Sequence, residues 1–180
     1  TNLKKAVINS DIIFICVGTP TKKNSKTSNL KYVFSVVKDL KKIIKKYKII
    51  ITKSTVPVST GDKIEKILIN LKKKKLVDIV SNPEFLREGE AIRDFIYPDR
   101  IIIGTDSKKA NKILKSLYLP IIKKTNRYFN TSRRGAELIK YASNAFLATK
   151  ISFINEMANL CEKANIDIKD ISLGMGSDER

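Results

Sequence analysis

Residues 81–90 read SNPEFLREGE and bring three carboxylates together just after a short apolar segment. The β-branched residues at 77–80 are typical of a buried strand, and Pro83 ends it because it lacks a backbone donor. If Pro83 opens a helical turn, Glu84 and Glu88 project from one face. Open α/β sheets bind ligands at the carboxyl ends of their strands, so this geometry indicates a site. The alternative is that both glutamates only charge a helix N-terminus, which is worth about 0.3–1 kcal/mol each.

Two further polar segments follow predicted strands. The first reads VGTP at residues 17–20, where Gly18 lets a ligand approach the backbone and the Thr19 hydroxyl can meet a phosphate or a ribose. An ordinary loop explains the same residues equally well. The second reads KSTVP at residues 53–57.

Helix capping is the simplest role for the hydroxyls of the KSTVP segment. The hydroxyls at residues 59–60 stand closer to the start of the next helix, however, and are predicted to cap it. Ser54 and Thr55 are therefore free to face a cleft.

Lys140 and Asn144 are four residues apart in a helical pattern and share a face, with Glu137 one turn before Lys140. From the residues alone, the default interpretation is an ordinary helix pair between Glu137 and Lys140, worth a few tenths of a kcal/mol.

These residues need an alternating order of strands and helices to position them. Hydrophobic periodicity predicts strands at residues 11–17, 49–52, 77–80 and 100–103, and helices at residues 30–47, 59–71, 107–117 and 132–164. Repeated strand–helix units predict an α/β class, a doubly wound parallel sheet with right-handed crossovers. A helix as long as that at 132–164 usually links domains, so we place a domain boundary near residue 130.

Composition narrows the class of protein. The chain has 180 residues, is 42% hydrophobic, carries a net charge of +18 and contains no histidine. The lysines spread over every predicted helix without interleaved aromatic residues, so they indicate solvated faces and no nucleic-acid partner. Apolar runs are too short to span a bilayer, which predicts a cytoplasmic protein without a membrane partner. Cys16, in a buried strand, and Cys161, in a helix, are predicted to be structural thiols, and no metal site is expected.

Taken together, the motifs resemble the nucleotide-sugar dehydrogenases of the UDP-glucose/GDP-mannose dehydrogenase family. Five blocks occur in family order: residues 14–20, 53–57, 81–90, 98–100 and 137–146. The resemblance implies a Rossmann-like domain, NAD as the cofactor and a homodimer. It implies oxidation of UDP-glucose to UDP-glucuronate in two hydride transfers, with GDP-mannose as the alternative substrate. In another class, the alternative is a non-catalytic basic binding protein.

The resemblance also assigns roles to residues. It implies NAD contacts for Val17, Thr19, Pro20, Ser54, Thr55 and Glu88. It implies substrate contacts for Glu84, Phe85, Leu86, Arg87, Glu88, Lys140, Asn144 and Arg180. Among these, Glu84 matches the general base of thioester hydrolysis, Thr55 helps to hold a water molecule, and Lys140 with Asn144 stabilises an oxyanion.

Two family motifs are not present in these 180 residues. No G-x-G-x-x-G phosphate turn occurs among the seven glycines, and neither cysteine has the Gly-Gly-Ser-Cys-Phe context of the family nucleophile. We therefore expect residues 1–130 to be the C-terminal part of an NAD-binding domain and residues 131–180 to begin a central helical dimerisation domain. We expect such a piece of a longer enzyme to be inactive alone.

Overall fold

The computed structural model describes residues 2–23, 25, 27–125 and 127–178. The chain divides into two compact units, Thr1–Lys140 and Tyr141–Arg180. Within the described residues, five strands of the first unit form one sheet in the order β1-β2-β3-β4-β5. The strands are β1 (Ile12–Ile15), β2 (Lys48–Thr52), β3 (Val77–Ser81), β4 (Ile101–Gly104) and β5 (Tyr128–Thr131).

The sheet consists of two parallel parts that join in opposite directions. β1, β2 and β3 pair in parallel, and β4 pairs with β5 in parallel. β3 and β4 are antiparallel and meet only at Ser81 and Gly104. The α/β class with a Rossmann-like, mainly parallel sheet is confirmed, and the strands depart from parallel pairing only at this junction of β3 and β4 in the described residues. The turn-rich segment after β3 reverses the chain without a crossover helix of the usual length.

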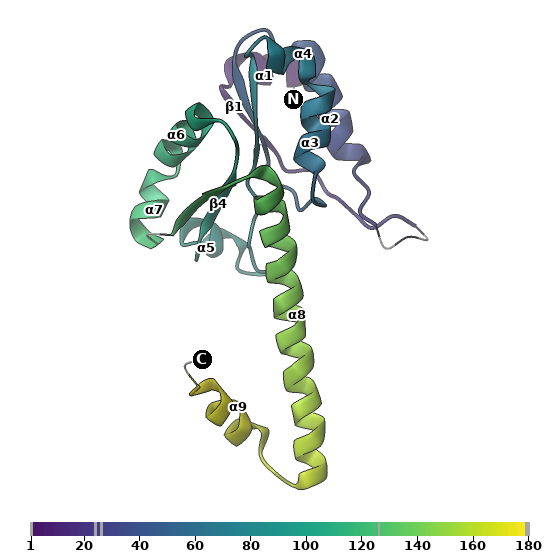
Figure 1. The fold of residues 1–180 in the computed structure, drawn as a ribbon, viewed down its shortest axis with the longest axis vertical. Coiled ribbons are helices and arrows are strands. Elements are labelled where there is room, and N and C mark those ends of the chain that lie inside the picture. The colour runs from purple at the N-terminus through teal and green to yellow at the C-terminus, as the bar shows by residue number, and fades with distance from the viewer. Residues whose placement is uncertain (1, 24, 26, 126, 179–180) are drawn as a thin grey trace. The chain divides into compact units, whose positions relative to one another are not determined.

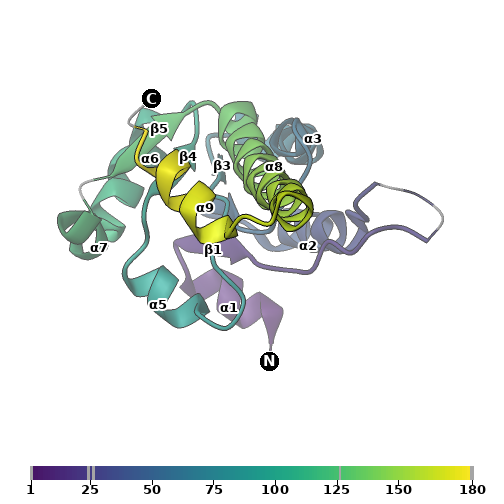
Figure 2. The same cartoon turned by 90° about the horizontal axis from the view of Figure 1, so that it is seen from below.

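Helices cover both faces of this sheet, as Figures 1 and 2 show. On one face, α2 (Lys31–Ile43), α3 (Thr60–Ile67) and α4 (Ile69–Lys73) lie over the first strands. Their buried side chains, such as Val37 and Ile64, pack against Ile50 and Ile79. On the other face lie α6 (Lys108–Leu117) and α7 (Leu119–Thr125). There, Leu114 of α6 packs against the opposite side of β2 and β4.

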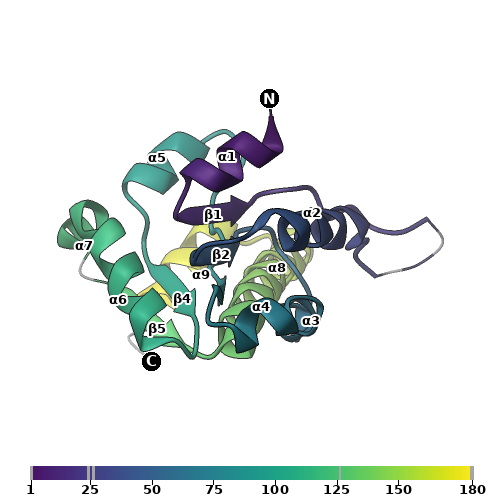
Figure 3. The ribbon, with the colours of Figure 1, turned by 90° about the horizontal axis from the view of Figure 1, so that it is seen from above.

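β1 lies at one edge of the sheet, where Figure 3 shows helix α1 (Leu3–Asn9) beside it. The prediction of a buried strand at residues 11–17 is wrong in two respects. The strand is shorter, and the Phe14 side chain is 40% exposed because an edge strand lacks a neighbour on one side. Cys16, which was expected inside this strand, is exposed just beyond it.

The helix starts follow the sequence signals only in part. Ser107 caps α6 as predicted, since its hydroxyl accepts a hydrogen bond from the Ala110 N–H. Ser59 precedes α3 but makes no side-chain capping bond, because its backbone adopts a left-handed conformation with φ of 71°. α1, α5 (Ala91–Ile96), α7, β5 and α9 (Ile168–Gly176) were not predicted, and most are short.

The longest helix is α8 (Arg133–Ala164), close to the predicted range of 132–164. Its first turns belong to the first unit and pack closely on Gly104, where an added Cβ would lie 2.6 Å from the Ala136 Cβ. The rest of α8 and α9 make up the second unit. Across the described residues, every helix is too short or too polar to cross a bilayer.

Candidate active site

The centre of the candidate site is Glu84, in the loop that follows β3. Residues 82–87 form no helix, so the prediction that Pro83 opens a helical turn is wrong, and Glu84 and Glu88 do not share a helical face. Instead, the Glu84 carboxylate curls back over its own loop. Its Oε2 accepts a hydrogen bond of 2.7 Å from the Leu86 N–H, and its Oε1 accepts one of 3.3 Å from the Thr55 hydroxyl.

Lys140 on α8 completes this cluster. Its Nζ lies 3.2 Å from Glu84 Oε1, and the lysine side chain is only 8% exposed. The Nζ also lies 5.2 Å from the centre of the Phe85 ring. A buried ammonium is costly unless it is paired, and Glu84 and Phe85 supply partners for this one.

The charge state of Glu84 follows from these contacts. Burial raises its pKa, but the Leu86 N–H, the Lys140 ammonium and the Thr55 hydroxyl together outweigh burial and hold the pKa below its usual value. The Glu84 carboxylate is half-buried, and because its pKa is lowered it is ionised at neutral pH.

The two segments predicted to face a cleft lie side by side at the carboxyl ends of β1 and β2. The Thr19 hydroxyl donates to the Thr55 carbonyl at 2.8 Å, and the Ser54 hydroxyl donates to the Val17 carbonyl at 2.6 Å. These hydroxyls tie the segments together. Pro20, in the same segment, is exposed.

The side chains of Phe85 and Arg87, although they belong to one loop, contact different partners. The Phe85 ring lies between Lys140 and the guanidinium of Arg100, whose Cζ is 4.1 Å from the ring centre. Arg87 turns away and forms hydrogen bonds of 3.0 and 2.7 Å with Asp94 of α5. The Leu86 side chain is 36% exposed.

The remaining predicted site residues are Glu88, Asn144 and Arg180. Glu88 is exposed in the turn before α5. Asn144 lies one helical turn beyond Lys140 on α8, in the second unit, and is exposed. Arg180 lies outside the described residues.

Lys53 is a site residue that the sequence did not reveal. Its Nζ donates to Asn82 Oδ1 at 3.3 Å, and burial lowers its pKa to about 8, although the nearby Glu84 carboxylate acts to raise it. Asn82 is held in turn by the Tyr118 hydroxyl at 2.6 Å and donates to the Ile102 carbonyl at 2.8 Å. A lysine directly after a strand whose residues are all buried was the only signal for this role.

Glu137 is the second residue whose place was misjudged. It does not pair with Lys140 as a helix neighbour. It is 2% exposed, and its Oε1 accepts hydrogen bonds from the Gly61 N–H at 2.8 Å and from the Ser81 hydroxyl at 3.1 Å. Burial raises the pKa of this carboxyl, against the hydrogen bonds from Gly61 and Ser81 and one from the Ser59 backbone. The carboxylate thus joins α8 to α3 and β3.

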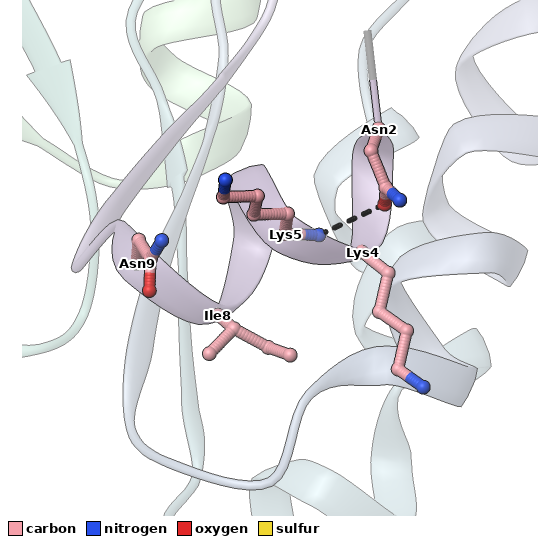
Figure 4. A pocket seen from close by; sticks show the side chains of 5 residues that line it. All are labelled: Asn2, Lys4, Lys5, Ile8 and Asn9. Carbon is pink, nitrogen blue, oxygen red and sulfur yellow. Dashed lines mark hydrogen bonds between the residues drawn. The ribbon is translucent and has the colours of Figure 1, made fainter.

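A separate hollow of about 220 Å³ lies along α1 and is lined by Asn2, Lys4, Lys5, Ile8 and Asn9 (Figure 4). It shares no residue with the Glu84 cluster. In the described part of the chain, no group of His, Cys, Asp and Glu residues could hold a metal ion.

An open α/β sheet with polar residues gathered at the carboxyl ends of its strands defines a Rossmann-like domain, a class that binds ligands at that edge. Comparison with known proteins gives the family. Residues 1–122 match the NAD binding domain of the UDP-glucose/GDP-mannose dehydrogenase family, and residues 134–180 match its central domain. The chain belongs to this family.

Individual members of the family are similar to this chain over nearly its whole length. The chain is 45% identical to the UDP-glucose 6-dehydrogenase of Rhizobium meliloti over 99% of its own length and 41% of that protein. A UDP-glucose dehydrogenase structure from Pyrobaculum islandicum has a TM-score of 0.89 at 35% identity, covering 98% of this chain and 41% of that one. A GDP-mannose dehydrogenase from Pseudomonas aeruginosa has a TM-score of 0.88 at 30% identity, again covering 98% and 41%. The chain thus spans about two fifths of these relatives.

Proposed function

We propose that this chain is part of an NAD-dependent UDP-glucose 6-dehydrogenase, which oxidises UDP-glucose to UDP-glucuronate. The observation that carries the proposal is the cluster of Glu84, Lys140 and Thr55, which two loops and a helix bring together. The 45% identity with the Rhizobium meliloti enzyme supports the reaction class.

The residues near β1 and β2 fit a nicotinamide cofactor in one respect. An added Cβ at Gly18 would meet nothing within 4 Å, so a ligand can approach the backbone there. In the proposal, Val17, Thr19, Pro20, Ser54, Thr55 and Glu88 line the NAD site. The bound cofactor would accept hydride from the sugar.

Lys140 is proposed to stabilise the negative charge that develops on the substrate oxygen at C6, together with Asn144. Its ammonium is fixed by burial, and a fixed cation in a dry site needs little reorganisation to act on that charge. The substrate oxyanion would then compete with Glu84 for the same ammonium.

Glu84 is proposed to take a proton from the water that hydrolyses the thioester, held by Thr55. In the structure its pKa is low, which makes it a weak base. Because Lys140 is one cause of that low pKa, transfer of the Lys140 contact to the substrate would make Glu84 more basic when it must accept a proton. Phe85, Leu86 and Arg87 are proposed to hold the sugar nucleotide, with Arg180.

The partner in the proposal is a second copy of the enzyme. The part of α8 in the second unit exposes large apolar side chains, including Phe146, Leu147 and Ile151 at 67, 57 and 52%. Apolar helix faces of this kind are usually covered in oligomers. GDP-mannose is the second candidate substrate because the Pseudomonas aeruginosa dehydrogenase has nearly the same fold similarity.

The test is a chimera in which this chain replaces the matching two fifths of the Rhizobium meliloti enzyme. We expect NADH formation with UDP-glucose and little with GDP-mannose. The matched control is the same chimera with Lys140→Met, which should fold and turn over about 10²–10³-fold more slowly. A folded chimera that oxidises neither sugar nucleotide would contradict the proposal, and preference for GDP-mannose would favour the second candidate.

A further inference from the structure

A small cavity of about 10 Å³ adjoins Lys140. Its lining includes Thr52, Ser54, Ser81, Glu137 and Lys140. Val56 and Pro83 complete the lining, so five of its seven residues are polar or charged, whereas cavities that stay empty inside proteins are normally apolar. The volume is at the lower limit for one water molecule.

Two buried polar atoms in this lining lack a hydrogen-bond partner among the described residues. They are the Thr52 hydroxyl oxygen and Glu137 Oε2. Both residues are 2% exposed. Leaving a buried polar group without a partner costs about 1–3 kcal/mol, so two of them around one cavity point to a ligand that satisfies both.

The hydrogen-bonding capacity of the lining suits a water molecule. Lys140 Nζ carries three N–H donors, and Glu84 takes one of them. Glu137 Oε2 is an acceptor, and the Thr52 hydroxyl can donate or accept. A water needs two to four polar partners, and these three groups supply a donor, an acceptor and a group that can be either.

We propose that this cavity is a built site for one water molecule that links Lys140 to Thr52 and Glu137. Glu137 is then a positioning residue: it holds the Lys140 ammonium through the water, while Glu84 contacts the same ammonium directly. The site is a property of the folded chain and does not depend on the proposed reaction.

The rival state is a dry cavity, in which the Thr52 hydroxyl and Glu137 Oε2 stay without a partner among the described residues. The two states differ in what Thr52→Val does. Valine keeps the shape of threonine and removes the hydroxyl. In a dry cavity no hydrogen bond connects Thr52 to Lys140, so the Lys140 ammonium would not respond to the loss of the Thr52 hydroxyl, whereas a bridging water makes it respond.

The experiment has two readouts on the 180-residue chain. One is a crystal structure that resolves ordered water, and the other is the NMR signal of the Lys140 side-chain ammonium. We expect one water in the cavity of the native chain, its loss in Thr52→Val, and a changed Lys140 signal in that variant. Thr52→Ser keeps the hydroxyl and should keep both the water and the native signal.

Thr105→Val is the matched control. Thr105 is also buried, but its hydroxyl bonds the Ile79 carbonyl and the Ser107 N–H, away from the cavity. The Thr105→Val variant should unfold at a lower urea concentration than the native chain and leave the NMR signal of the Lys140 ammonium unchanged. An empty cavity in the native chain, or an unchanged Lys140 signal in Thr52→Val, overturns the proposal. If Thr52→Val does not fold, the native chain and Thr52→Ser decide by the presence or absence of the water.

Discussion

Lys140 Nζ and Glu84 Oε1 lie 3.2 Å apart, although 56 residues of sequence separate them. The helix carrying the lysine and the loop carrying the carboxylate meet over the carboxyl ends of β2 and β3. One ion pair therefore ties the electrostatics of the candidate site to the packing of α8.

Lys140→Met in the chimera should lower turnover by about 10²–10³-fold, the scale for the loss of one oxyanion donor. The measurement is kcat for NADH formation with saturating UDP-glucose. Lys163→Met is the control, since Lys163 is exposed in the last turn of the same helix. Equal turnover of the two variants would show that Lys140 is only a structural cation.

Glu84→Gln should make the stability of the chain less dependent on acid pH. The folded pKa of Glu84 is lowered from 4.5, so between the folded and unfolded pKa values the unfolded chain binds more protons. The contribution of Glu84 is present above pH 4.5 and is lost as pH falls through the folded value. Urea unfolding at several pH values measures this, with Glu162→Gln as an exposed control. A stability difference from the native chain that stays constant with pH would refute it.

Lys53→Met should remove a rise in stability at alkaline pH. The pKa of Lys53 falls from 10.5 to about 8 on folding, so between these values the unfolded chain again binds more protons and stability rises with pH. The native chain should gain stability from pH 8 to 10.5 relative to the variant's flat profile. Lys63→Met, at an exposed position, should keep the rise. The prediction fails if Lys53→Met and the native chain show parallel profiles.

Gly104→Ala should destabilise the first unit by about 1–3 kcal/mol. The new Cβ would lie 2.6 Å from the Ala136 Cβ and 2.8 Å from the Ser132 carbonyl oxygen, where the backbone cannot yield easily. Gly18→Ala is the control, because its Cβ would enter open space. Thermal unfolding of the two variants compares them directly, and similar Tm values would mean that α8 can shift away from β4.

Local patterns in the sequence predicted the long elements well. The helix at 132–164 and the cap at Ser107 depend on periodicity and on one hydroxyl, and both are found in the structure. The turn at Pro83 was misjudged because proline fits the first turn of a helix and an extended loop equally well. The reversed direction of β4 depends on tertiary packing, which a strand pattern does not contain.

The same limit explains the site. Thr55, Glu84 and Lys140 were chosen from motifs, and the structure brings their side chains together, although their roles stay predictions. Glu137 and Lys53 were missed or misread because their partners are distant in sequence: Gly61 lies 76 residues from Glu137, and Asn82 lies 29 residues from Lys53. Helical spacing suggested Lys140 as the partner of Glu137, whereas in the folded chain the buried carboxylate bonds groups far from it in the sequence, such as the Gly61 N–H.

The single residue pair that joins β3 to β4 has a consequence for how the sheet comes apart. Each of the other strand pairs is joined by several paired residues, so the pairing does not depend on any one of them. At this junction the Asn82 side-chain amide also donates a hydrogen bond to the Ile102 carbonyl and so links the segment after β3 to β4. Side chains therefore hold β3 and β4 together: the Asn82 amide, the Thr105 hydroxyl on the Ile79 carbonyl, and Leu114 of α6, which packs on both parts of the sheet. Substitutions among them should loosen the junction from which the Glu84 loop starts.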